Sequence, residues 1–183
     1  MTSGNALRIE ILSPSQAEDT ALMSTVASLI NEVYEVAEKG LWAEGTSRTT
    51  TDEVAALTRA GEITTAYMDG EVVACMRLQR MGDRACEFGM LAASPKRRGL
   101  GLGRELVRFA EQYAREAGRD VMQLEVLVPR EWSHPSKVFL ADWYTRIGYQ
   151  VVRTGTIEEA YPDLAPHLVT PCDFVIYHKP LNL

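Results

Sequence analysis

The stretch "KRRGLGLGREL", Lys96 to Leu106, holds three glycines at alternate positions directly before a helical pattern. Glycine there loses backbone entropy and offers no side chain for packing, so its presence indicates a need for bare backbone. The first amides of a helix have no partner within it, and the helix dipole adds partial positive charge. Glycines let a phosphate approach those amides. The stretch therefore predicts an anion site at a helix N-terminus.

Two other glycine loops that bind phosphate match this stretch poorly. The dinucleotide loop has the spacing G-x-G-x-x-G, whereas Gly99, Gly101 and Gly103 give G-x-G-x-G, and no acidic residue suitably ends the next strand. The nucleoside-triphosphate loop ends in Gly-Lys-Ser/Thr, whereas Arg104 and Glu105 follow Gly103. The remaining alternative is a glycine-rich turn without a ligand.

Composition indicates a globular protein. The chain has 183 residues, 46% of them hydrophobic, and a net charge of −6, which suits one domain over residues 1–183. It shows neither an apolar run long enough for a membrane span nor the plan of a signal peptide, so we expect a cytoplasmic protein without a membrane partner. The net charge argues against nucleic acid. The one basic cluster frames the glycines and comprises Lys96, Arg97, Arg98 and Arg104.

The cysteines and histidines show no metal-binding pattern. The cysteines are odd in number and lack CxxC spacing, so we expect reduced core residues at Cys75, Cys86 and Cys172. The histidines have neither HxxxH spacing nor a nearby cysteine, and no metal site is predicted at His134, His167 or His178.

Periodicity predicts a mixed α/β sheet in the order β-α-α-β-β-β-α-β-α-β-β. We expect strands over 7–12, 62–81 (a hairpin turning at Asp69-Gly70), 85–93, 120–128, 149–154 and 173–181. Helices are expected over 14–37, 50–61, 102–117 and 137–147. In the third helix, Leu102, Leu106 and Tyr113 belong to an apolar stripe, and the side predicted to face water includes Glu111.

"SPKRRGLGLGREL" resembles the pyrophosphate-binding motif of the GNAT acyltransferase superfamily, Arg/Gln-x-x-Gly-x-Gly/Ala, with Arg98, Gly101 and Gly103 at the specified positions. "EFGMLAASP" and "LEVLV…FLADWYTRIGYQVV" resemble the neighbouring strands and helix of that family, in the same order. The resemblance runs from about Leu7 to Leu181. It implies a mostly antiparallel sheet of about seven strands with four helices, in which two parallel strands splay apart.

The resemblance also implies acetyl-CoA as cosubstrate. Its pyrophosphate would accept hydrogen bonds from the amides of Arg98, Gly99, Leu100, Gly101, Leu102, Gly103 and Arg104. The pantetheine arm and thioester would bind freed backbone groups at Leu91 and Ala93, although valine or isoleucine is more usual at the latter. Lys137 stands where many members have an asparagine that contacts pantetheine, which puts that contact in doubt.

Acetyl transfer to an amine needs a neutral amine and a proton for the leaving thiolate. The attack can be direct, because the thioester is already activated. By resemblance, the acid is Tyr144, four residues before Gly148, at the CoA sulfur. The alternative for Tyr144 is core packing with Leu140.

Two carboxylates compete as the base. Glu125 lies mid-strand in "QLEVLV" and aligns with the base of the superfamily's ribosomal-protein N-terminal acetyltransferases, whereas Glu87 aligns with the base of its histone acetyltransferases. Burial in a partly dry cleft would raise the pKa of either carboxyl group. A structural ion pair for either residue, or a water chain in place of both, remains open.

The segment with Tyr34, Trp42 and Arg48 walls the acceptor site by resemblance, and "IEEAYPDLAPHLVT" is expected to close over it. Arg48 either holds a substrate carboxylate or faces solvent. Trp132 and His134 either line the cleft or pack within their loop.

These residues favour an N-acetyltransferase acting on the primary amine of a small molecule, amino acid or peptide. The alternatives are a non-catalytic acyl-CoA-binding or sensing domain and a protein N-terminal acetyltransferase. Assembly as a homodimer is left open.

Overall fold

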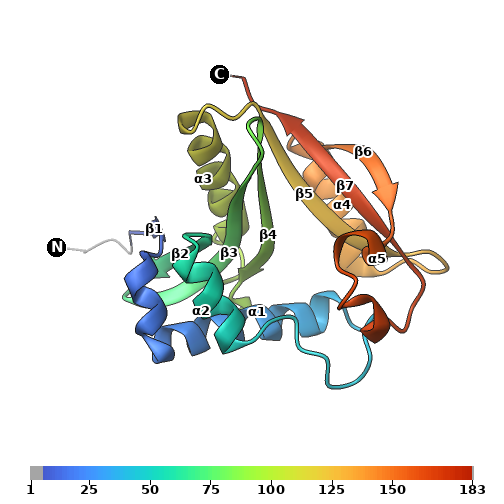
Figure 1. Cartoon of the computed structure of the whole chain (residues 1–183), viewed down its shortest axis with the longest axis horizontal. Coiled ribbons are helices and arrows are strands. Elements are labelled where there is room, and N and C mark those ends of the chain that lie inside the picture. Colours follow the sequence, from blue (N-terminus) through green and yellow to red (C-terminus); the bar gives the residue numbers. More distant parts are fainter. Residues whose placement is uncertain (1–5, 183) are drawn as a thin grey trace.

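The computed structural model describes residues 6–182, which form a seven-stranded sheet with helices on both faces (Figure 1). The strands are β1 (Arg8–Ile11), β2 (Ile63–Met68), β3 (Glu71–Met81), β4 (Ala85–Ala93), β5 (Val121–Pro129), β6 (Gln150–Gly155) and β7 (Cys172–Pro180). The mixed α/β class and the strand order along the chain are as predicted.

The four expected helices are α1 (Thr20–Ala37), α2 (Thr51–Arg59), α3 (Leu102–Glu116) and α4 (Pro135–Arg146). A one-turn helix, α5 (Ile157–Ala160), occurs in the segment that was expected to be a loop. Short 3₁₀ turns cover Pro14–Glu18, Pro95–Arg97 and Ala165–His167. The Thr50 side chain caps α2 by accepting a hydrogen bond from the Glu53 amide.

The strands lie in the order β1-β2-β3-β4-β5-β7-β6. All neighbours are antiparallel except β4 and β5. The β2–β3 hairpin turns at Asp69 and Gly70, which both have the left-handed backbone that a type I′ turn requires. Because β7 lies between β5 and β6, the last strand along the chain is internal and β6 forms an edge of the sheet.

The parallel pair is short. Only Ala85–Glu87 pair with Val121–Gln123, and Glu87 with Gln123 is the last pair. Beyond it β4 follows β3 while β5 follows β7 along its whole length, so β4 and β5 diverge toward α1 (Figure 1). The splay that the resemblance implied is therefore present, and it leaves one backbone edge of each strand without a ladder partner.

A β-bulge at Met90 reverses the side-chain alternation of β4. The β3–β4 register shifts between Cys75 and Arg77, and Met90 has a left-handed φ of 52°. Before the bulge, Cys86 and Phe88 pack in the core cluster under α3; after it, Met90 and Ala92 pack in the cluster under α1.

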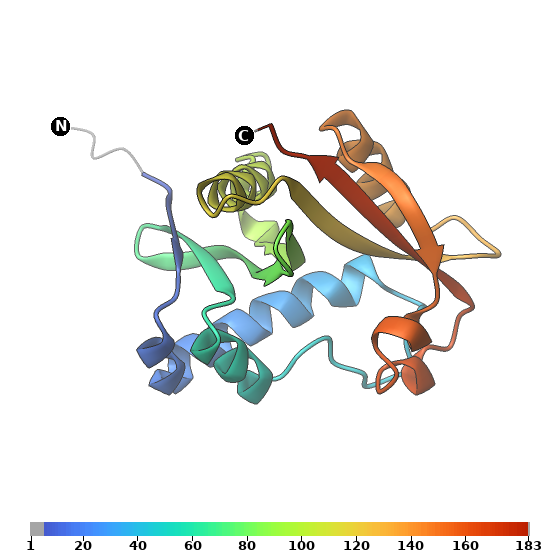
Figure 2. The same ribbon diagram turned by 45° about the horizontal axis from the view of Figure 1, so that its top comes forward.

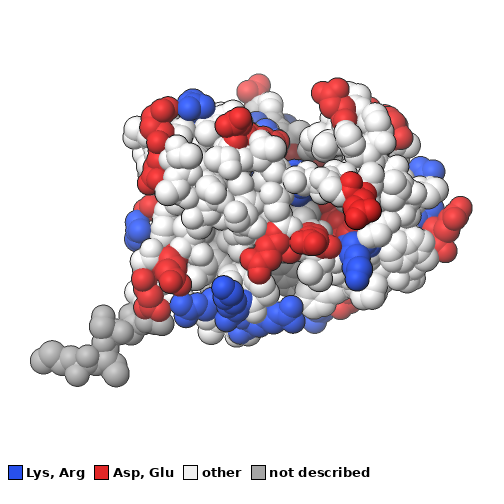
Figure 3. Space-filling view, turned by 90° about the horizontal axis from the view of Figure 1, so that it is seen from below, with Lys and Arg blue, Asp and Glu red and all other residues white. Residues whose placement is uncertain are grey.

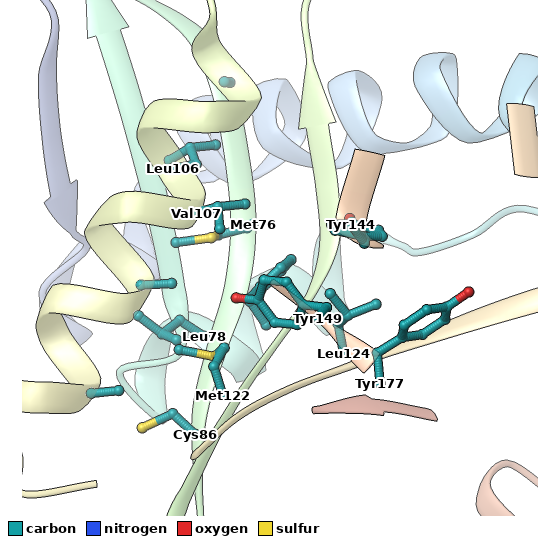
Figure 4. Close-up of a cluster of buried hydrophobic side chains, with 14 of the residues drawn as sticks. Met76, Leu78, Cys86, Leu106, Val107, Met122, Leu124, Tyr144, Tyr149 and Tyr177 are labelled. Atoms are coloured by element: carbon teal, nitrogen blue, oxygen red, sulfur yellow. The ribbon is translucent and has the colours of Figure 1, made fainter. Parts of the chain in front are cut away.

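Two apolar clusters hold the helices on the sheet. Helix α1 runs across one face, where it packs with α2 (Figure 2). Helix α3 covers the other face, over a cluster that includes Leu106, Met122 and Tyr149 (Figure 4). The prediction that Glu111 faces water is wrong: it is 7% exposed, accepts a 3.0 Å hydrogen bond from the Tyr149 hydroxyl and pairs with Lys179. These two partners compensate the desolvation of its carboxylate.

The three cysteines are free and buried, as expected. Within residues 6–182, no helix has the length and apolar character needed to cross a membrane.

Candidate functional site

A cavity of about 860 Å³ opens where β4 and β5 diverge, and most of the predicted site residues line it. These are Tyr34, Trp42, Arg48, Glu87, Leu91, Ala93, Arg98, Gly99, Gly101, Leu102, Gly103, Glu125 and Tyr144. Two predicted residues, Leu100 and Arg104, do not contribute to the lining. The fold thus brings residues from five separate segments of the chain to one cleft.

One wall of the cleft is the N-terminus of α3, which has no side-chain cap. Gly101 takes the N-cap position with a left-handed φ of 69°. None of the amides from residue 98 to 104 donates a hydrogen bond to another group of the described chain. Unpaired amides beside the positive end of a helix dipole suit an anion such as a pyrophosphate.

Among the basic residues of the glycine loop, some form ion pairs within the described part of the chain and others do not. The Arg97 guanidinium lies 3.8 Å from Asp69 and 3.6 Å from Glu71, whereas Arg98 is exposed and forms no ion pair in the described chain. Seen from below, the surface shows Lys and Arg gathered along one border, beside Asp and Glu (Figure 3). The protein is therefore locally basic despite its negative net charge.

Two tyrosines, Tyr34 and Tyr144, line the cleft beside β4. Burial raises the pKa of Tyr34 to about 12, while the Arg48 charge and the Leu91 amide oppose that rise. Burial raises the pKa of Tyr144 further, and the nearby Tyr34 and Tyr177 add to it. Tyr144 is 5% exposed, and its hydroxyl makes no hydrogen bond within residues 6–182. It therefore remains protonated at neutral pH with its proton free to be donated.

Glu87 lies at the vertex of the splay, held by both carboxylate oxygens. Gln79 Nε2 donates to Glu87 Oε1 at 2.8 Å, and Gln123 Nε2 donates to Glu87 Oε2 at 2.5 Å. Gln123 Oε1 in turn lies 2.7 Å from His178 Nε2. These four residues are consecutive cross-strand neighbours on β3, β4, β5 and β7, and together they form a polar ladder across the sheet.

Glu125 is the second carboxylate of the cleft. Tyr161 donates a 3.3 Å hydrogen bond to Glu125 Oε2. Burial, followed by the negative charge of Glu87, raises the pKa of Glu125 to about 7, and the Tyr161 hydrogen bond and the Arg153 charge only partly oppose this. A carboxyl group that titrates near neutrality suits a general base.

The sequence analysis did not assign a role in the site to Gln79, Gln123, His178 or Tyr161. The two glutamines flank Glu87 only through strand register, which sequence periodicity does not fix. Tyr161 follows α5 in the segment expected to close over the acceptor site, and Leu164 of that segment also lines the cleft. An aromatic residue in a segment expected to close the site was the available clue.

Tyr34, Trp42 and Arg48 lie at one end of the cleft, where a second cavity of about 370 Å³ adjoins it and shares these residues. The Arg48 guanidinium lies over the Tyr34 ring, with 5.3 Å between Cζ and the ring centroid. Tyr34 and Trp42 thus give this end of the cleft aromatic walls.

Lys137 forms a buried ion pair. Its Nζ lies 2.7 Å from Glu38 Oε2, and both side chains are more than 90% buried. The pair joins the start of α4 to the end of α1, so Lys137 has a structural partner at the position where the resemblance placed an asparagine.

Of the two alternatives for Trp132 and His134, the structure favours packing within their loop over lining the cleft. Neither contributes to its lining. His134 caps α4 through its Nδ1, and its Nε2 lies 3.1 Å from the Lys39 carbonyl oxygen. Trp132 is 43% exposed and its ring stacks against His134. The described residues contain no cluster of side chains suited to a metal ion.

The sequence was compared with models of known protein families. The sequence model of the acetyltransferase (GNAT) family matches residues 27–136. This span is more than half of the chain and includes residues 27–37 of α1, the splayed strand β4 and the glycine loop. The chain therefore belongs to the GNAT acetyltransferase family, whose members are acyltransferases. No curated protein sequence matches it.

Solved structures share the fold at low identity. The PaiA N-acetyltransferase from Thermoplasma acidophilum, solved with coenzyme A, matches with a TM-score of 0.69, 16% identity, and 96% and 99% coverage of this and that chain. Ard1 from Thermoplasma volcanium matches with a TM-score of 0.63 and 16% identity, and the match covers 97% of this chain and 99% of that chain. N-acetylglutamate synthase from Neisseria gonorrhoeae, solved with coenzyme A and N-acetyl-glutamate, matches with a TM-score of 0.62 and 17% identity. The match covers 97% of this chain but only 36% of that chain.

Proposed function

We propose that this protein transfers an acetyl group from acetyl-CoA to a primary amine. The observation that carries the proposal is the joint placement, in one cleft, of the unpaired α3 amides and of two carboxylates at the point where β4 and β5 part. Several structural neighbours were solved with CoA or acetyl-CoA bound, which supports a ligand of this kind.

The residues present fit such a ligand. The amides from residue 98 to 104 and the Arg98 side chain would hold the pyrophosphate. The edge of β4 at Leu91 and Ala93, without a partner on the β5 side, would bind the pantetheine arm and the thioester carbonyl. Acetyl-CoA supplies an activated thioester, so the protein needs no nucleophile of its own.

We assign the proton transfers to Glu125 and Tyr144, and an electrostatic role to Glu87. Glu125 accepts the proton of the incoming ammonium, because its pKa of about 7 makes the carboxylate available near neutrality. Glu87, fixed by two amide donors, holds a negative charge beside it. Tyr144 donates the proton that the departing sulfur needs, since its hydroxyl is otherwise unpaired.

The test is a thiol-release assay with acetyl-CoA against a panel of primary amines, together with calorimetric titration of CoA. We expect CoA binding and turnover of at least one class of amine. CoA binding without turnover of any amine would favour a non-catalytic acyl-CoA-binding domain. Turnover confined to peptide N-termini would favour a protein N-terminal acetyltransferase.

A further inference from the structure

We infer that the acceptor is an amine that also carries a carboxylate, as an amino acid does, and that Arg48 binds this carboxylate. The inference rests on the proposed function and specifies its substrate class. It comes from the position of Arg48, from the lack of a partner for its charge, and from its relation to Glu125 through Tyr161.

Arg48 lies where the two cavities meet. It lines both of them, together with Tyr34, Glu38, Trp42 and Leu164. Its guanidinium lies over the Tyr34 ring at 5.3 Å, a cation–π contact that restricts the side chain without using its N–H donors. The planar fork of the guanidinium is thus held at the cavity wall with its donors available, and this fork matches the geometry of a carboxylate.

Arg48 forms no ion pair or side-chain hydrogen bond with any residue from 6 to 182. Of the two carboxylates that line the main cavity at this end, Glu38 pairs with Lys137 at 2.7 Å, and Glu53 accepts a 2.5 Å hydrogen bond from Thr49. Glu35 and Glu44 line the second cavity and form no ion pair with another residue of the described chain. The other arginines that line the cleft differ from Arg48. Arg77 pairs with Glu62, Arg97 lies near Asp69 and Glu71, and Arg98 belongs to the glycine loop.

Tyr161 relates Arg48 to the proposed base. The Tyr161 hydroxyl donates to Glu125 Oε2 at 3.3 Å. Burial and the charges of Glu125 and Glu87 raise the pKa of Tyr161 to about 12, and the positive charge of Arg48 acts against this rise. Tyr161 therefore has a carboxylate and a guanidinium in its surroundings. An acceptor with an ammonium near Glu125 and a carboxylate near Arg48 would complement both, whereas a plain amine would leave Arg48 without a counter-charge.

The experiment compares α- and ω-amino acids with their own carboxamides as acceptors, using wild-type protein and the variants Arg48→Gln and Arg48→Lys. For the wild type we expect kcat/KM to be at least about 10-fold higher for the acid than for its amide, as hydrogen bonds to charged groups allow. This preference would hold although the amide has the less basic amine, which is more readily neutral. The panel also shows whether the carboxylate is α or ω.

In Arg48→Gln we expect KM for the amino acid to rise roughly 10- to 100-fold, with little change for the amide. In Arg48→Lys, KM for the amino acid should lie between the values for the wild type and Arg48→Gln, because lysine keeps the positive charge but lacks the planar pair of N–H donors. Arg146→Gln is the matched control: this arginine lies exposed on α4, paired with Asp142, and its loss should leave the kinetics unchanged. CoA affinity and Tm of each variant separate recognition from folding.

Equal kcat/KM for acids and amides in the wild type, or an acid preference that persists in Arg48→Gln, would overturn the inference while the acetyltransferase proposal stands. Turnover of no amine at all, with CoA bound, would overturn both.

Discussion

Gln123 donates a 2.5 Å hydrogen bond to Glu87 at the last residue pair of the parallel β4–β5 ladder. Backbone pairing between these strands ends at this residue pair, and a side-chain bridge stands at the point where it ends. Glu87 therefore lies at the vertex of the splay, where both strands are still fixed to each other, and Glu125 lies two residues further along β5. Such a position restricts the motion of Glu87 more than a place on a loop would.

The two carboxylates can be distinguished by their effects on the pH profile. Glu87→Gln removes the negative charge that helps to raise the pKa of Glu125, so the acid limb of kcat/KM should move to lower pH. Glu125→Gln should instead lower kcat by about 10²–10⁴, the usual contribution of a general base. Steady-state kinetics of both variants between pH 5 and pH 9 test this prediction. The acid limb of each variant is compared with that of the wild type, which should follow the Glu125 pKa of about 7. The reverse pattern would make Glu87 the base.

Glu125→Gln should also change how stability depends on pH. The pKa of Glu125 is raised from 4.5 to about 7 in the folded protein, so the folded state binds more protons than the unfolded state in that window. Wild-type stability attributable to this residue is then lost as pH rises from about 4.5 to about 7. The variant should melt at a higher temperature than wild type at pH 8, and the difference should vanish near pH 4. A constant difference across pH would indicate a packing effect.

The glycine loop can be tested without backbone strain at Gly103. Its φ lies outside the left-handed region, and an added Cβ would meet only the Trp143 ring, at an ordinary 3.6 Å. Gly103→Val should therefore fold and lose CoA affinity, because side-chain bulk would stand before the amides. Gly101→Ala adds strain at φ +69°, and Gly118→Ala, strained at φ +71° at the far end of α3, is its control. Unchanged CoA affinity in folded Gly103→Val would contradict the anion site.

Tyr144→Phe removes one hydroxyl and keeps the packing with Phe88, Tyr149 and Tyr177. Since that hydroxyl has no hydrogen bond in the described chain, we expect Tm and CoA affinity to stay near wild type. The rate constant kcat should fall by about 10²-fold, toward the lower end for a general acid. Tyr34→Phe is the comparison, because Tyr34 also approaches the edge of β4 at Leu91. A larger loss of kcat in Tyr34→Phe would transfer the role of acid to Tyr34.

The buried ion pair should be sensitive to loss of one partner. Lys137→Met leaves the Glu38 carboxylate buried without its cation, at a cost of about 3–5 kcal/mol in the free energy of unfolding. The double variant Lys137→Met, Glu38→Leu should recover much of this loss, since no charge is left buried. Urea unfolding of the wild type, the single variants Lys137→Met and Glu38→Leu, and the double variant measures the coupling. Strictly additive losses would show that the pair contributes nothing.

The sequence predicted the helices and strands themselves better than it predicted which of them lie next to each other in space. The positions of glycine and the hydrophobic periodicity predicted α3 and the β2–β3 hairpin, since these depend on local backbone preferences. The place of β7 between β5 and β6 depends on pairing between distant segments and was not predicted. Glu111 was misassigned because its partners, Tyr149 and Lys179, come from distant elements.

The candidate site divides in the same way. The motif in the glycine loop and the spacing between Tyr144 and Gly148 could be recognised from the sequence, because each depends only on residues close together along the chain. The glutamines that hold Glu87 were not, because strand register alone makes them its neighbours. The bulge at Met90 was also hidden, since "ACEFGMLAA" gives no sign that its alternation reverses.

That bulge also determines which sequence changes the fold can absorb during evolution. Leu91 and Ala93 pack toward the α3 side only because Met90 adds one residue to β4. A deletion of one residue here would turn every later side chain of the strand to the opposite face, whereas substitutions around Glu87 leave the following backbone in place. Point substitutions before the bulge can therefore change the residues around Glu87 while the edge of β4 that is proposed to bind the thioester keeps its position.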